Sequence, residues 1–189
     1  MSQLVDLLRE TRSRTLELVA DLNDGQMIGP RLAIVHPPLW EIGHVAWTQE
    51  FWALRHLRRQ KPLLEGADAI YNSSDVAHDT RWELLLPSRE KTLEYMKSVL
   101  NRVTDSLSSQ EPARETLYFY LLVIFHEDMH DEAIAYTRQT LAYPPPKLSV
   151  APAHSNNIGS GPLTDDVEIP GGTFMLGATP DSPFVFDNE

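Results

Sequence analysis

Two histidines, His126 and His130, stand four residues apart within an apolar run that is compatible with a helix. Residues at positions i and i+4 lie on the same helix face, about 5–6 Å apart at Cβ, so both imidazoles can reach one cation. Neutral imidazole is the commonest side-chain metal ligand and suits zinc, copper, iron and nickel alike. The run also fits the H-E-x-x-H pattern of zinc proteases. The pair therefore predicts a metal site and leaves its chemistry open.

A third candidate ligand, His44, lies on a second apolar stripe. This stripe keeps the alternating spacing of four and three residues that places side chains on one helix face: Trp40, His44, Trp47, Phe51 and Leu54. A lone histidine on such a stripe is more often a core residue than a ligand, but three imidazoles in one core would be costly to bury without a shared cation. The other histidines compete less well, since they lie outside or at the ends of the predicted helices: His36, His56, His78 and His154.

The zinc-protease interpretation is weakened by the residues that follow the pair. A metzincin would continue with a glycine and a third histidine, but these positions hold Ala133 and Tyr136. No glutamate ligand on a following helix is evident, because a proline-rich linker comes next. Glu127 could activate a zinc-bound water. We prefer the interpretation that the acidic residues form a solvated patch or neighbours of the ligands: Glu127, Asp128, Asp131 and Glu132.

Four amphipathic segments must position these histidines. Apolar spacing and stop signals predict helices over four ranges: 3–22, 38–59, 88–107 and 112–141. The connection over residues 60–87 is expected to hold one short turn around residues 81–86, and loops of such length are usually functional. Long helices joined in this way predict a mainly α fold, a four-helix bundle, which commonly builds metal sites between facing helices.

The last part of the chain has a different composition. A proline run and a segment rich in Ser, Asn, Gly and Pro indicate a linker over residues 143–165, after a bundle over residues 1–142. Residues 167–177 have the pattern of strand, turn and strand. Because a lone pair of strands is marginal in water, we expect residues 166–189 to begin a longer, truncated β-rich domain, or the strands to dock on the bundle.

Composition limits the classes of function. With 42% hydrophobic and 23% charged residues among 189, the chain is typical of a globular protein. Its formal net charge of −11 argues against nucleic-acid and anionic-membrane surfaces. Since there is no cysteine, any metal must bind His, Asp or Glu side chains. No signal peptide is evident and no apolar run approaches the ~20 residues of a membrane-spanning helix, so a cytoplasmic protein is expected.

Three motifs in this order carry a family resemblance that spans most of the chain. Residues 37–44 (Pro-Pro-Leu-Trp-Glu-Ile-Gly-His) resemble the first metal motif of the DinB-like bundle in ergothioneine-synthase-type sulfoxide synthases, and residues 126–132 (His-Glu-Asp-Met-His-Asp-Glu) resemble the second. Residues 167–177 resemble the opening of the formylglycine-generating-enzyme (FGE-sulfatase, C-type-lectin-like) domain that follows the bundle there. The selenoneine synthases belong to this group, and Trp-Glu-Ile-Gly-His-Val-Ala-Trp at residues 40–47 looks closer to them than to the mycobacterial-type enzymes.

The resemblance implies a mononuclear non-haem iron(II) held by His44, His126 and His130, with positions open for O2 and a sulfur or selenium substrate. The implied reaction is iron(II)- and O2-dependent oxidative C–S or C–Se bond formation on the imidazole of hercynine, the trimethylated betaine of histidine. The cosubstrate would be a thiol or a selenium sugar. The family's catalytic tyrosine lies in the C-terminal domain, little of which is in this sequence. No catalytic residue is therefore assigned, and whether this chain alone is active stays open.

Two residues are candidates for substrate binding. In several relatives a glutamine precedes the third histidine and contacts hercynine; here that position holds Met129, which cannot make this hydrogen bond and is at least as well suited to filling a core. Arg81, at the end of the long connection, matches the geometry of a substrate carboxylate. A surface salt bridge is the preferred role for Arg81.

Two other classes of function stay open. DinB-like bundles also occur in zinc- or nickel-dependent thiol transferases and hydrolases, which would need no downstream domain. A non-catalytic helical interaction module would hold structural histidines and no stoichiometric metal. The segment Gly-Gly-Thr-Phe-Met-Leu-Gly at residues 171–177 favours the synthase over both. The sequence fixes neither the chalcogen donor nor the oligomeric state.

Overall fold

The structure is a computed structural model that describes residues 2–108, 112–149, 166–179, 182 and 184–186. The chain divides into two compact units, Met1–Leu148 and Ser149–Glu189. Among the described residues, none of the helices combines the length and the apolar character needed to cross a membrane.

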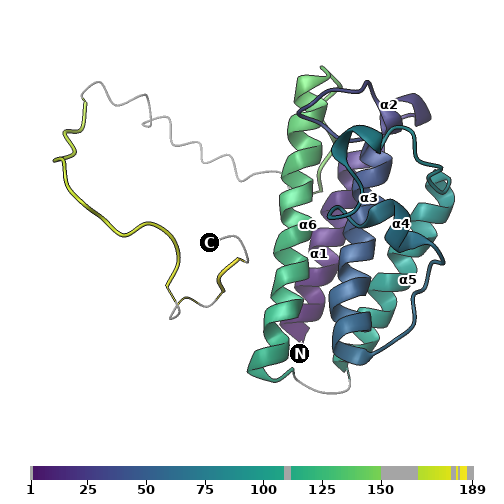
Figure 1. The fold of residues 1–189 in the computed structure, drawn as a ribbon, viewed down its shortest axis with the longest axis horizontal. Helices are drawn as coiled ribbons and strands as arrows, with labels where there is room; N and C mark the ends of the chain where they lie inside the picture. Colours follow the sequence, from purple (N-terminus) through teal and green to yellow (C-terminus); the bar gives the residue numbers. More distant parts are fainter. Residues whose placement is uncertain (1, 109–111, 150–165, 180–181, 183, 187–189) are drawn as a thin grey trace. The chain divides into compact units, whose positions relative to one another are not determined.

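Four long helical segments form the first unit and confirm the predicted mainly α bundle (Figure 1). They are α1 (Ser2–Val19), α3 (Pro38–Gln49), α5 (Arg89–Ser108) and α6 (Arg114–Thr140). The helix α3 continues directly into η1 (Glu50–His56), one segment of π-helix. Proline at the first position of α3 starts this helix well, since its missing N–H has no intrahelical partner there.

Each of α1 and α3 packs against both α5 and α6, which closes the bundle. Near the ends of the parallel pair α1 and α6, Arg138 donates a hydrogen bond to the Leu18 carbonyl (2.9 Å). The start of α5 lies beside the end of α1, as the hydrogen bond from Arg89 to the Leu22 carbonyl (2.5 Å) shows. The helices α3 and α6 are antiparallel neighbours, since His44 lies beside His130 whereas Trp52, further along the same helical segment, lies beside the earlier Phe119 (Figure 1).

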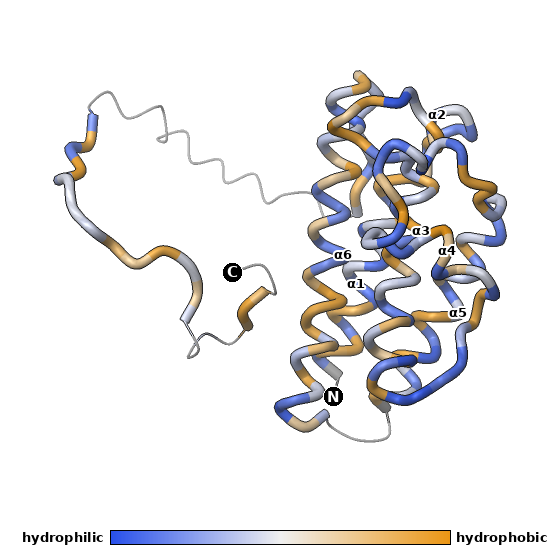
Figure 2. Tube along the Cα trace, viewed as in Figure 1, coloured by the Kyte–Doolittle hydropathy of each residue, from blue (hydrophilic) through white to orange (hydrophobic). Residues whose placement is uncertain are grey.

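The core lies between the apolar faces of these helices, and hydrophobic and hydrophilic stretches alternate along each of them (Figure 2). Every residue of α3 is buried, including its charged and polar ones. The reason is that α3 is covered by α5 and α6 and also by α4. A polar side chain on α3 therefore has to find its partners inside the protein.

The connections contain more structure than the sequence predicts. The short helix α2 (Asp24–Ile28) begins with a capping box between Asn23 and Gln26. The connection over residues 60–87 contains α4 (Ala67–Tyr71) and the 3₁₀ turn η2 (His78–Thr80), besides the expected turn after Arg81. Helices this short leave no periodic pattern in a sequence, so the expectation of a single turn was wrong.

The predicted strand–turn–strand over residues 167–177 is not present, because the described residues 166–179 contain no strand. The apolar side chains of this segment are mostly exposed, with Ile169 at 85% and Met175 at 96%. The start of a β-rich domain is thus unsupported, and the physical reason is that two strands without further sheet or core are marginal. Most of the predicted linker, at 150–165, lies outside the described residues.

Candidate metal centre

The three predicted ligands converge between α3 and α6. The ring centroids are 5.1 Å apart for His44 and His126, 4.8 Å for His44 and His130, and 4.5 Å for His126 and His130. One nitrogen from each ring can be chosen so that all three lie within 4.8 Å of one another. Antiparallel packing makes this possible, since it sets the middle of α3 against the His126–His130 turn of α6. The structure thus brings together the residues that the spacing had singled out.

The electrostatic setting keeps the rings of His44 and His126 neutral at neutral pH. Burial, and next the neighbouring His130, lowers the pKa of His44 to about 3. Burial, again followed by His130, also lowers the pKa of His126 well below its usual value. A neutral imidazole has a free lone pair on one nitrogen, which is the form that binds a metal.

Hydrogen bonds on the far side of His44 and His130 show which nitrogen of each ring is free. His44 donates from Nδ1 to the Tyr71 carbonyl (2.7 Å). His130 donates from Nδ1 to Glu41 Oε2. A carbonyl or carboxylate oxygen only accepts, so Nδ1 of both rings carries the proton, and the lone pair of the neutral form of each ring is on Nε2. The buried Nδ1 of His126 has no hydrogen-bond partner among the described residues.

These observations fit a bound cation. One nitrogen of each ring lies within 4.8 Å of the other two, and the buried Nδ1 of His126 without a partner is otherwise costly. A three-nitrogen set suits zinc, copper, iron or nickel, and it leaves further coordination positions for water or substrate. The residues present can therefore hold one divalent ion.

The helix α4 orients His44 from behind. Three α3 side chains donate hydrogen bonds to this short segment: Trp40 Nε1 to the Ile70 carbonyl (2.7 Å), His44 to the Tyr71 carbonyl, and Trp47 Nε1 to Asp68 Oδ1 (2.6 Å). The Trp40 ring also stacks on His44, with centroids 4.7 Å apart and planes 9° from parallel. The spacing of Trp40, His44 and Trp47 thus serves both core packing and ring orientation.

Gly43 permits this arrangement. A Cβ added at Gly43 would lie 2.3 Å from Cε1 and Cζ of the Tyr71 ring. Only glycine leaves room for this buried ring beside α3. Sequence reasoning missed Glu41, Gly43 and Tyr71. A glycine inside an apolar helix was the available signal, since it costs ~1 kcal/mol relative to alanine and so calls for a packing reason.

Glu127 points away from the metal centre. Its Oε1 accepts from Arg12 Nε (2.6 Å) and Thr15 Oγ1 (2.9 Å), both on α1. It is 1% exposed, and Asp131 is 6% exposed, so the first of the two expected alternatives, a solvated patch, is wrong for these two residues. Glu132 is exposed, as expected. With both oxygens committed to Arg12, Glu127 is not placed to act as a zinc-protease base.

The other histidines that the structure describes stay outside the centre. His36 lies beside Arg81, His56 packs against Trp52, and His78 hydrogen-bonds the Val35 carbonyl. His154 lies outside the described residues.

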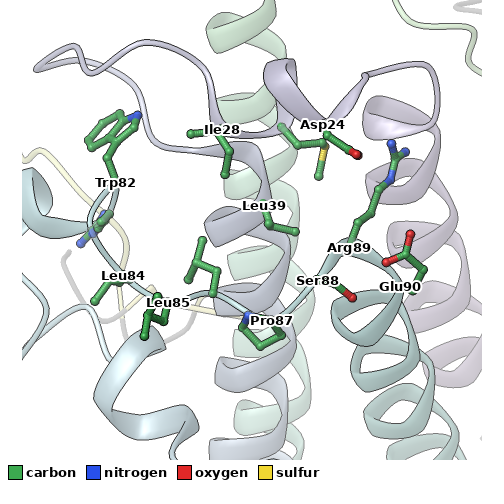
Figure 3. A pocket seen from close by; sticks show the side chains of 13 residues that line it. Asp24, Ile28, Leu39, Trp82, Leu84, Leu85, Pro87, Ser88, Arg89 and Glu90 are labelled. Atoms are coloured by element: carbon green, nitrogen blue, oxygen red, sulfur yellow. The ribbon is translucent and has the colours of Figure 1, made fainter.

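Arg81 is buried, so the preferred role in a surface salt bridge was wrong. Its guanidinium carbon lies 3.8 Å from the centroid of the Trp40 ring. The Trp40 ring in turn stacks on His44. One of its guanidinium nitrogens lies 3.0 Å from His36 Nδ1. Burial lowers the pKa of Arg81. Arg81 also lines a pocket of about 380 Å³ between α2, Leu39 and the start of α5, with Trp82 at one side and Arg89 at the other (Figure 3).

Met129 is on the solvent side of α6, with 45% of its surface exposed. It therefore does not fill the core, which corrects that alternative.

Comparison with known proteins agrees with the motifs. Residues 7–134 match the family model of the DinB superfamily. Hercynine oxygenase of Mycolicibacterium smegmatis is 28% identical over 189 residues, which cover 98% of this chain and 43% of that protein. Hercynine oxygenase of Mycolicibacterium thermoresistibile is 28% identical over 194 residues, which cover 100% of this chain and 42% of that protein. The resemblance inferred from the motifs is confirmed, and the chain spans less than half the length of these curated relatives.

Proposed function

Because this chain belongs to the DinB superfamily, we propose that its three-histidine centre is the iron(II) site of an enzyme that forms C–S or C–Se bonds on hercynine with O2. The observation that carries the proposal is the convergence of His44, His126 and His130 in a chain that is similar to hercynine oxygenases. The activity would belong to a longer protein, since those relatives extend well beyond the matched region.

When bound, iron(II) would supply O2 activation and a coordination position for the sulfur or selenium donor. The chain's own part is to hold the ion with three neutral rings, which leave its positive charge uncompensated by the direct ligands and so favour an anionic donor. The α3–α6 pair fixes the rings in place, and α4 holds His44 from outside. Burial of the ring nitrogens keeps bulk water from competing for the lone pairs.

Arg81 is the proposed partner for a substrate carboxylate. Its guanidinium group has no carboxylate hydrogen-bond partner among the described residues, and its Nε is buried without one. An arginine in this state favours an anion, because guanidinium and carboxylate match in shape and charge. Arg81 contacts the Trp40 ring, and the Trp40 ring contacts His44, so Arg81 lies near the proposed metal centre.

A selenium donor and an FGE-type continuation are finer parts of the same proposal. The stretch at residues 40–47 supports a selenoneine synthase, and residues 167–177 support a continuation into an FGE-sulfatase-like domain. The exposed apolar side chains of that segment are consistent with a partner surface supplied by further chain.

The experiment is metal analysis of the protein purified without O2, followed by titration of hercynine onto the iron-loaded form. We expect one iron per chain and a hercynine-dependent spectral change. Alanine at His44, His126 or His130 should abolish iron binding, whereas His78→Ala and His154→Ala should bind iron normally. Zinc or nickel without a hercynine response would instead indicate the transferase or hydrolase class. No stoichiometric metal would indicate an interaction module.

A further inference from the structure

Glu41 is a buried carboxylate beside the metal centre. It lies on α3, one turn before His44, and is 1% exposed. Its Oε2 accepts the Nδ1–H of His130 on α6, while its Oε1 has no hydrogen-bond partner among the described residues. The nearby Arg81 makes its own hydrogen bonds to His36 and to the Val76 carbonyl.

A neutral histidine is a poor partner for a buried charge. Removing a carboxylate from water costs several kcal/mol, and a single hydrogen bond from a neutral ring offsets only part of this cost. A cation on the opposite nitrogen of His130 changes the balance, because it polarises the ring and places positive charge beyond it. With a metal on Nε2 of His130, Glu41 and His130 would form a carboxylate–histidine–metal triad.

The three rings differ in what supports them. His130 is backed by a carboxylate, His44 by the neutral Tyr71 carbonyl, and His126 by no described hydrogen-bond partner. A carboxylate acceptor raises the basicity of a ligating imidazole more than a carbonyl does, since the acceptor itself is charged. His130 should therefore be a stronger donor than His44.

We propose that Glu41 is a positioning residue that holds His130 in its Nε2-binding tautomer and makes it the anchor of the centre. This inference rests on the proposed metal site but not on the reaction carried out there. Glu41 also places one negative charge beside three neutral ligands, with the cationic Arg81 nearby.

The test compares the divalent-metal affinity of Glu41→Gln with that of the unsubstituted parent chain. Both are titrated anaerobically with Fe(II), and with Co(II) as a spectroscopic probe. Loss of an outer partner of a metal ligand typically weakens metal binding 10- to 100-fold, and we expect an effect of about this size. The Co(II) ligand-field bands should shift as well, since one donor becomes weaker. Glu132→Gln is the matched control, because it removes an exposed carboxylate from the ligand-bearing helix; its affinity should equal that of the parent chain.

Glu41→Met serves as the second variant, since it replaces the buried charge with an apolar side chain of similar size and should fold if Glu41→Gln does not. It should also lose at least about 10-fold in affinity. Parent-like affinity and Co(II) spectrum in either folded variant would overturn the inference and leave the proposed function standing. A parent chain that binds neither metal would overturn both.

Discussion

The two faces of α6 differ in whether their buried polar side chains have hydrogen-bond partners. His126 and His130 face α3, where their rings meet His44 and one ring nitrogen lacks a hydrogen-bond partner. Glu127, the residue next to His126, faces α1 and accepts three hydrogen bonds, from Arg12 and Thr15. Both sites are buried and polar, but only the carboxylate of Glu127 has its hydrogen-bond partners within the described part of the protein.

This difference separates a structural site from a binding site better than burial does. A satisfied buried ion pair fixes how two helices pack and offers nothing to a ligand. A buried cluster with free lone pairs is costly by itself and is stabilised when a cation joins it. We call the side of α6 that contacts α1 the α1 face and the side that contacts α3 the α3 face. The comparison predicts that the α1 face stabilises the fold without metal. It also predicts that the α3 face lowers the stability of the metal-free protein and raises it once a metal is bound.

The largest effect should come from breaking the α1 face. Arg12→Met leaves the Glu127 carboxylate buried without its cation, and we expect a loss of about 3–5 kcal/mol in the free energy of unfolding. Urea denaturation of the metal-free protein measures this loss. Arg31→Met is the control, because Arg31 is 50% exposed and its partner Glu83 is 69% exposed, so this ion pair should contribute less than about 1 kcal/mol. Equal losses in the two variants would contradict a special role for the buried pair.

The α3 face should respond to metal instead. At a free metal concentration of 100 times Kd, binding stabilises the folded state by about 2.7 kcal/mol, and a chelator should remove this gain. His126→Leu should unfold at the same or a higher denaturant concentration than the metal-free parent, because it removes a buried nitrogen without a described partner. It should show no response to metal. Strong destabilisation of metal-free His126→Leu would mean that the ring is a structural element.

The support of His44 can be separated from the ligand itself. Gly43→Ala pushes a Cβ against the Tyr71 ring, and overpacking of this kind costs about 1–3 kcal/mol. Because the Tyr71 carbonyl orients His44, metal affinity should fall together with stability. Gly43→Ala combined with Tyr71→Leu should regain much of the stability lost to crowding, which denaturation of both variants would show. Additive losses would mean that the contact does not matter.

The sequence is informative where a pattern is long and local. Helical spacing predicts α1, α3, α5 and α6, and it places His126 and His130 on one face because i and i+4 always coincide there. The approach of His44 follows less directly, since it depends on α3 packing against α6.

Contacts between segments that are distant in the sequence could not be predicted from it. Arg12 and Glu127 are separated by 115 positions, and nothing local to either residue names the other. The helix α4 and its Tyr71 carbonyl depend on donors from α3, and the link between Glu41 and His130 depends on the packing of α3 against α6. The contacts of His44 and His130 decide the orientation of these ligands, which is why the sequence predicts the ligands and misses their supports.

The smallest effect should be at Met129, on the exposed surface of α6 between the two faces. Met129→Gln should change the free energy of unfolding by less than about 0.5 kcal/mol, since the side chain is 45% exposed. Metal affinity should be unchanged as well, because Met129 contributes no ligand to the three-histidine cluster. Hercynine affinity of the iron-loaded protein, measured by spectral titration, should rise if an amide here gains a hydrogen bond to the substrate. A change in metal affinity instead would mean that this surface and the ligand face act together, and the division of α6 into independent faces would have to be abandoned.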